Sequence, residues 1–265
     1  MIWALVTKTW RDHWKSTISW TVGLFSMVAI ELIVYPTIKR AGAGMSQLIE
    51  SMPASFKSVF RMNDYTSGPG FLGAELFSMM VPLIFIAVGA AAGARATAEE
   101  ESSGTADILL ALPVTRAKIV LSKTFAALAV IFGLTVVLIL SLVVGVRMAG
   151  LVITNSGLIG ASIQTALLGV LFTGVALLIG ALTGRKSIAL GISIALSIAM
   201  FILYSLAPLV NSIGRTVWLN PFQWAIGGEP LLTGLSFGHT ITLTVVSAAL
   251  IFFAVLAFNR RDISS

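Results

Sequence analysis

The sequence contains no cysteine, which excludes disulfide bonds, zinc–thiolate sites and iron–sulfur clusters. Charge is also scarce, because only 11% of the 265 residues are Asp, Glu, Lys or Arg, whereas a soluble domain has about 25%. So few charged side chains cannot cover a water-facing surface, and 57% of the residues are hydrophobic. We therefore expect most of the protein to lie in lipid, as one membrane domain over residues 1–265.

Sequence signatures of an ATP-binding loop and of a metal site are missing as well. There is no G-x-x-x-x-G-K-[ST] loop, so these residues cannot cradle the phosphates of ATP. The zinc-protease pattern H-E-x-x-H does not occur, and the two histidines, His13 and His239, have no partner at the spacing of metal ligands. We predict no catalytic residue, no metal site and no cofactor in this chain.

Six apolar runs predict an all-α fold with six transmembrane helices. A helix needs about 20 apolar residues to cross the hydrocarbon, and its backbone groups must bond internally there. The runs cover residues 18–35, 71–94, 119–146, 158–183, 188–210 and 240–258. The first run is expected to remain in the protein rather than to be removed as a signal peptide. Gly89 and Gly93 have the four-residue spacing that lets two helices approach closely.

Lys and Arg flank these runs unequally. One side holds eleven of them, including both termini and the tight hairpin Gly184-Arg185-Lys186-Ser187, and the other side holds six. By the positive-inside rule, both termini are cytoplasmic in a multi-pass protein of the cell membrane. Because the basic residues lie at the edges of apolar runs, we expect them to meet membrane lipids and not nucleic acid.

Two segments outside the runs are expected to lie at the membrane interface. Residues 1–15 predict an amphipathic helix in the headgroup layer, anchored on one face by Trp3, Trp10 and Trp14 with cations opposite. The alternative is a plain cytosolic extension of the first span. Residues 211–239 are too apolar for a solvated loop but are broken at Asn220-Pro221 and Glu229-Pro230, which predicts a re-entrant hairpin at the outer face.

Glu31 lies in the outer half of the first run. An ionisable residue in a membrane helix is costly, which makes Glu31 a candidate for the substrate path. A hydrogen bond to a neighbouring helix explains it equally well, so both interpretations stay open. Pro82 is expected to kink the second span, with Ser78 near enough to satisfy the freed backbone.

The loop over residues 95–118 joins the second and third spans on the cytoplasmic side. Three glutamates, 99–101, extend the second span into water, and residues 102–104 end it. Thr105 or Ser103 then caps a short helix that Pro113 stops. Its apolar face, which either docks a protein or lies on the membrane surface, comprises Ile108, Leu109 and Leu112, with Asp107 outside it. The adjacent carboxylates suit a protein partner, because anionic lipid would repel them.

This loop resembles a known element. The run Glu100-Glu101-Ser102-Ser103-Gly104-Thr105, followed by Leu109-Leu110 and Pro113-Val114-Thr115-Arg116, is similar to the cytosolic loop with the coupling helix in type-2 ABC permeases. The amphipathic start, six spans and an Asn-Pro before the last span match the same family. The resemblance implies these ATPase-coupling residues: Glu100, Glu101, Gly104, Thr105, Asp107, Ile108, Leu109, Leu112, Pro113 and Arg116.

The resemblance also implies a function. Two permease subunits, identical or different, would form a dimer, and each would bind a separate cytosolic ATPase that holds ATP–Mg. ATP-driven closure of the ATPases would export a substrate by alternating access, and the apolar spans favour an amphiphile such as a drug, antibiotic, lipid or peptide. Two alternatives are an ion- or proton-coupled secondary carrier, supported by Glu31, and a membrane anchor of a signalling complex, which would use the same docking loop.

Overall fold

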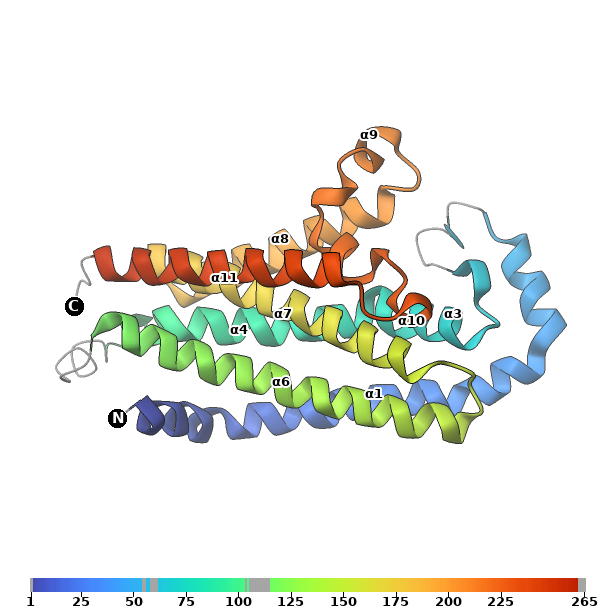
Figure 1. The fold of residues 1–265 in the computed structure, drawn as a ribbon, viewed down its shortest axis with the longest axis horizontal. Coiled ribbons are helices and arrows are strands. Elements are labelled where there is room, and N and C mark those ends of the chain that lie inside the picture. The colour runs from blue at the N-terminus through green and yellow to red at the C-terminus, as the bar shows by residue number, and fades with distance from the viewer. Residues whose placement is uncertain (1, 54–55, 58–61, 103, 105–114, 262–265) are drawn as a thin grey trace.

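The protein is an all-α bundle in the computed structural model, which describes residues 2–53, 56–57, 62–102, 104 and 115–261. Side chains are not described for residues 2–13, 42–43, 45–46, 63 and 100. Six helices in the described part are long and apolar enough to cross a membrane, which confirms the predicted spans: Trp14–Ala41, Gly68–Glu99, Arg116–Ala149, Asn155–Thr183, Lys186–Leu206 and Phe237–Arg260. Both termini lie at one end of the bundle (Figure 1), here called the terminal end; the opposite end is the far end.

The first helix is much longer than the sequence predicted. Helix α1 (Ile2–Ser51) has 50 residues, about 75 Å at 1.5 Å per residue, which exceeds the full thickness of a bilayer. Beyond its membrane-crossing part it turns away from the bundle at the far end (Figure 1), so the first half of the expected outer loop is helical. Residues 2–15 continue into the span without a break; their position in the headgroup layer stays a prediction.

The second span is built from three consecutive helical pieces: α3 (Gly68–Leu72), the π-helical η2 (Gly73–Met80) and α4 (Val81–Ser102). Pro82 has no N–H to donate, and the wider π-helical turns come directly before it. The expected role of Ser78 was wrong in detail. Its hydroxyl donates to the carbonyl oxygen of Ala74, while the N–H of Val81 bonds to Leu76.

Helix α7 (Asn155–Thr183) occupies the middle of the bundle and packs against α4, α6 (Arg116–Ala149), α8 (Lys186–Leu206) and α11 (Phe237–Arg260). Glycines set the close approach of α4 and α7, as their spacing predicted. A Cβ atom on Gly89 would collide with the carbonyl oxygen of Gly169, and one on Gly93 with that of Thr173. The core therefore depends on bare backbone at these two turns of α4.

The segment after α8 is irregular. It contains α9 (Asn211–Gly214), η3 (Val217–Leu219), the π-helical η4 (Gln223–Gly227) and α10 (Pro230–Thr233). Asn220 fixes it to the bundle, because its amide nitrogen donates to the carbonyl oxygen of Met200 at 2.8 Å and its amide oxygen accepts the N–H of Phe222 at 2.9 Å. The predicted interruptions of the segment are present; its re-entry into the membrane stays a prediction.

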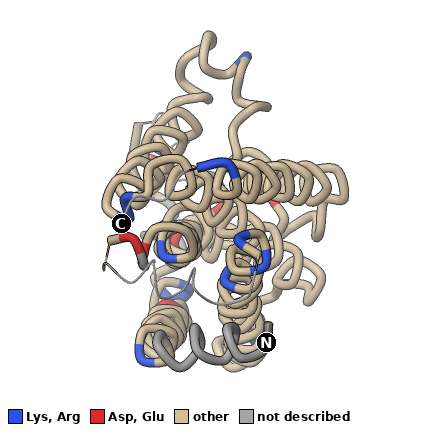
Figure 2. Tube along the Cα trace, turned by 90° about the vertical axis from the view of Figure 1, so that its left-hand side faces the viewer, with Lys and Arg blue, Asp and Glu red and all other residues tan. Residues whose placement is uncertain are grey.

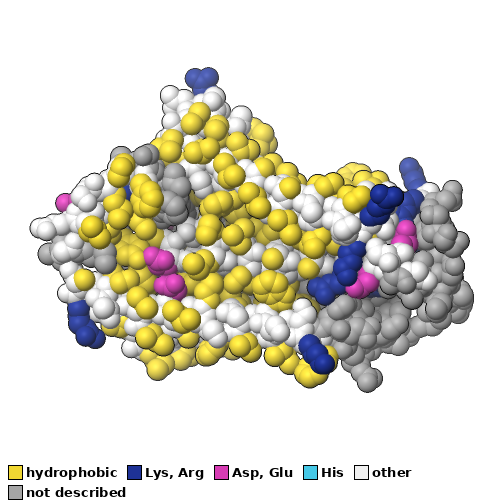
Figure 3. All heavy atoms as spheres, turned by 180° about the vertical axis from the view of Figure 1, so that it is seen from behind, with side chains coloured by type: hydrophobic (Ala, Val, Ile, Leu, Met, Phe, Trp, Pro, Cys, Tyr) yellow, Lys and Arg dark blue, Asp and Glu magenta, His cyan; other side chains and the backbone are white. Residues whose placement is uncertain are grey.

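The surface matches a protein that crosses a bilayer. Hydrophobic side chains cover the middle of the face shown in Figure 3, and Lys and Arg lie toward the ends. Viewed onto the terminal end, Figure 2 shows basic and acidic residues gathered around the helix ends. This polar rim at the terminal end contains the site described next.

Candidate functional site

The candidate site begins where α4 ends. Helix α4 stops at Ser102, and Gly104 follows in the left-handed conformation with φ of +69°. The N–H of Gly104 donates to the carbonyl oxygen of Glu101 at 3.3 Å. A side chain is disfavoured at such a φ, which explains the glycine in the predicted motif.

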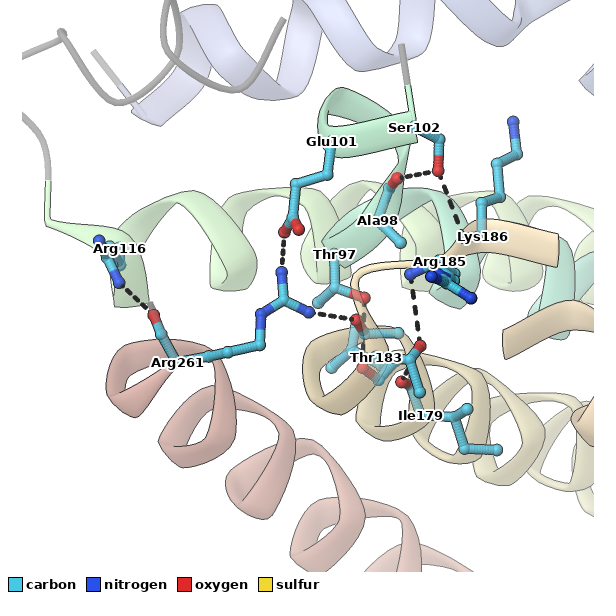
Figure 4. Close-up of polar contacts among 12 residues, drawn as sticks. Thr97, Ala98, Glu101, Ser102, Arg116, Ile179, Thr183, Arg185, Lys186 and Arg261 are labelled. Atoms are coloured by element: carbon cyan, nitrogen blue, oxygen red, sulfur yellow. Dashed lines mark hydrogen bonds and ion pairs between the residues drawn. The ribbon is translucent and has the colours of Figure 1, made fainter. Parts of the chain in front are cut away.

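Arg261, directly after α11, binds both stems of the predicted docking loop. These stems are the end of α4, which precedes the loop, and the start of α6, which follows it. Its guanidinium forms an ion pair with the carboxylate of Glu101 and donates to the carbonyl oxygen of Gly180 at 3.4 Å. Its own carbonyl oxygen accepts a hydrogen bond from the guanidinium of Arg116 at 2.7 Å. Glu101 precedes the loop and Arg116 follows it, so one residue joins α4, α6, α7 and α11 (Figure 4).

A second connection joins α4 to the hairpin between α7 and α8. The ammonium of Lys186 lies 2.9 Å from the carboxylate of Glu99, and the backbone N–H of Lys186 donates to the hydroxyl of Ser102 at 3.4 Å (Figure 4). The hairpin turns at Gly184, whose φ is +66°. Both polar connections thus run from the last turn of α4 to neighbouring helices.

Electrostatics explain why α4 needs these partners. The C-terminal end of a helix carries a partial negative charge, so glutamates in the last turn are unfavourable there without nearby cations. The side chain of Glu101 is only 13% exposed and that of Arg261 only 20%, so water screens this pair less than the more exposed Glu99–Lys186 pair. Glu101 and Arg261 are therefore the stronger of the two connections.

Next to the ion pairs, α4 and α7 are packed so closely that they cannot easily move relative to each other. The hydroxyl of Thr97 donates to the carbonyl oxygen of Leu177 at 3.2 Å, and both atoms are buried. A Cβ on Gly180 would collide with the hydroxyl oxygen of Thr97. A displacement of the end of α4 must therefore move α7 as well.

Three of the predicted coupling residues, Glu101, Gly104 and Arg116, meet in this site. The following lie outside the described residues: Thr105, Asp107, Ile108, Leu109, Leu112 and Pro113, together with the side chain of Glu100. Of the predicted interfacial anchors, Trp14 is exposed, and the side chains of Trp3 and Trp10 are outside the described part.

Glu31 lies elsewhere, beside the buried stripe of α1. Its carboxylate interacts electrostatically with that of Glu75 on η2, which in turn accepts a hydrogen bond from the hydroxyl of Tyr65. Burial, assisted by this bond, raises the pKa of Tyr65 above its ordinary value, so Tyr65 remains the donor. Glu31 is therefore near enough to Glu75 for their charges to interact, and its role on a substrate path stays a prediction.

Sequence reasoning missed Arg261 and Lys186 as partners of the glutamates. Both had been counted only as basic residues that set the orientation. The available signal was charge complementarity: three consecutive glutamates lie on the same side of the membrane as the basic hairpin and the basic end of the last span. Opposite charges confined to one thin layer are expected to pair.

The comparison with known families agrees with this architecture. The family described as "ABC-2 family transporter protein" matches residues 3–263, nearly the whole chain. The chain belongs to the ABC-2 transporter family. It is therefore a multi-pass permease of an ABC transporter, whose partner is an ABC ATPase subunit. No curated protein matches the chain at a significant level.

Membership of the ABC-2 family suggests what the polar site can be used for. An ABC-2 permease works with an ABC ATPase subunit, and the polar site connects several membrane helices at one end of the bundle. Within the described residues, no three His, Asp or Glu side chains are grouped as a metal site would require. The site's chemistry is thus ion pairing and hydrogen bonding between helix ends, which suits transmission of movement.

Proposed function

We propose that this permease exports an amphiphilic substrate, driven by ATP hydrolysis on a separate subunit, and that residues 105–114 form the ATPase-docking element. The observation that carries the proposal is the position of Arg261. Its guanidinium binds the stem before this element through Glu101, and its carbonyl oxygen binds the stem after it through Arg116. A push on the docking element would reach α4, α6, α7 and α11 together.

The direction of the force follows from the proposed orientation. With the basic terminal end in the cytoplasm, the docking element faces the ATPase, and ATP–Mg stays on that partner. Closure of the ATPases would displace the end of α4, and α7 would follow because its backbone contacts α4 at Gly89 and Gly93. The membrane helices would then switch access from the cytoplasm to the outside of the cell membrane.

A dimer of permease subunits, identical or different, completes the proposed transporter. Helix α8, the fifth span, supports this because its buried residues are small: Ala189, Ser193 and Ser197. Large apolar side chains such as Ile194, Ile198 and Ile202 are exposed in the single chain. This face is available to lipid or to a second permease subunit.

Membership of a transporter family favours this proposal over the secondary carrier and the membrane anchor. The Glu31–Glu75 pair is the observation that favours a carrier, since proton relays in membranes use such carboxylates. It lies on α1 and η2, away from the residues that join the helix ends. The carrier hypothesis predicts transport without any ATPase, which a vesicle assay of the permease alone tests directly.

Docking is tested by Leu109→Asp. Loss of a buried leucine costs roughly 1.5–3 kcal/mol, and an unpaired charge in the interface adds to this. A total of several kcal/mol lowers affinity about a hundredfold or more. We expect the variant to lose its ATPase on co-purification while its melting temperature stays unchanged. Full co-purification of the variant would show that this segment is not the docking element.

A further inference from the structure

A cavity of about 560 Å³ opens at the far end of the bundle. Its walls come from the beginning of the second span and from the segment between α8 and α11, including the last turn of α8, η4 and α10. Sites for small molecules typically enclose about 300–1,000 Å³. The cavity therefore has the size of a ligand site, and neither the ATPase-docking element nor the polar site at the terminal end contributes to it.

Both π-helical segments of the described chain face this cavity. Helix η2 contributes Gly73 and Phe77, and η4 contributes Gln223 and Ile226. A π-helical turn is rare, and it occurs frequently at functional sites. Two such segments from opposite halves of the sequence, meeting at one cavity, indicate that its shape is specifically built.

Backbone strain lies at the same place. Glu229 is the one non-glycine residue with positive φ, 51°, among the described residues. An L-residue is disfavoured there, and such strain persists only where the surroundings impose it. Here the carbonyl oxygen of Glu229 accepts the N–H groups of Leu232 at 2.9 Å and Thr233 at 3.1 Å. These bonds fix the turn that places Glu229, an exposed residue, in the lining of the cavity.

The charged residues in the described lining of the cavity are all acidic. Two acidic residues, Asp64 and Glu229, line the cavity, and the described lining contains no Lys or Arg. The remaining wall is largely apolar, with Phe77, Ile226 and Leu231. An apolar wall with carboxylates at its edge complements a ligand that has an apolar body and a positive charge.

We propose that this cavity binds a lipophilic cation, with its apolar groups against Phe77 and Ile226 and its charge beside Glu229 and Asp64. The inference rests on the proposed function and narrows it, because it names the substrate class and places a substrate site at the far end. The site would hold the substrate after access has switched away from the cytoplasm.

Equilibrium dialysis of the purified permease, without its ATPase, tests the proposal with two probes. Tetraphenylphosphonium and tetraphenylborate have nearly the same shape and opposite charges. We expect saturable binding of tetraphenylphosphonium to one site per chain and none of tetraphenylborate. Glu229→Gln and Asp64→Asn should each raise the dissociation constant about threefold to tenfold, as expected for a partly screened ion pair. Glu50→Gln, an exposed carboxylate on α1 outside the lining, is the matched control and should change nothing.

A second variant guards against an uninformative result. Glu229→Lys should abolish tetraphenylphosphonium binding and create binding of tetraphenylborate, a gain that a misfolded protein would not show. Equal affinity for both ions, or unchanged affinity in both neutral variants, would overturn the proposal. A second copy or a lipid filling the cavity would give that same charge-independent result. Because the assay needs no ATPase, intact cation binding alongside failed coupling would count against the exporter mechanism and leave this site standing.

Discussion

Glu101 and Arg261 form an ion pair between residues 160 positions apart in the sequence, where the end of α4 meets the end of the last helix. The pair lies in the polar site of the ABC-2 permease, between the residues that flank the proposed docking element. It is mostly shielded from water, and Arg261 also bonds to α6 and α7. Four membrane helices are thus connected at the surface that faces the proposed ATPase.

Removing the guanidinium should destabilise the permease. In Arg261→Gln the poorly solvated carboxylate of Glu101 loses its counter-charge, which costs about 1–3 kcal/mol. We expect a melting temperature several degrees lower in detergent. Arg260→Gln, which changes an exposed arginine one residue earlier, is the matched control and should melt like the wild type. Equal melting of both variants would show that the ion pair contributes nothing to stability.

Because α4 and α7 are in close contact, adding one methyl group at Gly93 should lower the stability of the fold. Gly93→Ala places a Cβ against the carbonyl oxygen of Thr173 and 3.1 Å from the Cβ of Ala176, and such overpacking costs about 1–3 kcal/mol. Gly133→Ala on α6 has no atom within 4 Å of the new Cβ and should be neutral or stabilising. Thermal melting of both variants checks this, and a wild-type melting temperature for Gly93→Ala would show that the helices separate easily.

Glu31→Gln should stabilise the permease and leave cation binding unchanged. The neutral amide removes the repulsion between Glu31 and Glu75, and Glu31 is not among the residues that line the cavity. Tyr65→Phe is the informative companion, because it removes the hydrogen bond to Glu75 and should cost about 1 kcal/mol. Weaker tetraphenylphosphonium binding by Glu31→Gln, with unchanged melting, would instead place Glu31 on the substrate path.

The isolated permease should bind no ATP and hydrolyse none. Its sequence has no G-x-x-x-x-G-K-[ST] phosphate-binding loop. The measurement is ATP turnover by the purified chain, compared with the same preparation after addition of its ATPase. ATP turnover by the chain alone, with a turnover per mole of permease that stays constant through purification, would refute the claim that a separate subunit hydrolyses the ATP.

The sequence was informative where a single physical constraint acts along the chain. The thickness of the hydrocarbon layer predicted the six spans, and the four-residue spacing of Gly89 and Gly93 predicted a close helix contact, although only the structure shows that its partner is α7. The predictions failed in detail where partners come from distant segments. Nothing local to Glu101 identifies Arg261, because their pairing depends on how the last helix packs. The extension of α1 to Ser51 was missed because residues 36–51 contain Pro36, Gly42 and Gly44, which disfavour a helix, and were therefore taken as a loop.

The cavity could not be predicted for a related reason. Its lining combines Asp64 and Phe77 with residues that come far later in the sequence. The π-helical turns of η2 and η4 follow no period that a sequence pattern reveals, and Glu229 adopts a conformation that glutamate seldom prefers. The interruptions at Asn220-Pro221 and Glu229-Pro230 were visible, so the place was indicated while its chemistry was not.

The most direct test of the proposed coupling is a charge swap between Glu101 and Arg261. The measurement is ATP hydrolysis by the reconstituted complex relative to the free ATPase, with co-purification as the control for assembly. Glu101→Arg and Arg261→Glu should each assemble normally yet lose most of the stimulation, because like charges then face each other at the stems of the docking element. The double variant restores an opposite pair and should recover at least about half of the stimulation, as expected for directly coupled residues. Full stimulation in both single variants, or no recovery in a folded and assembled double variant, would contradict transmission through this ion pair.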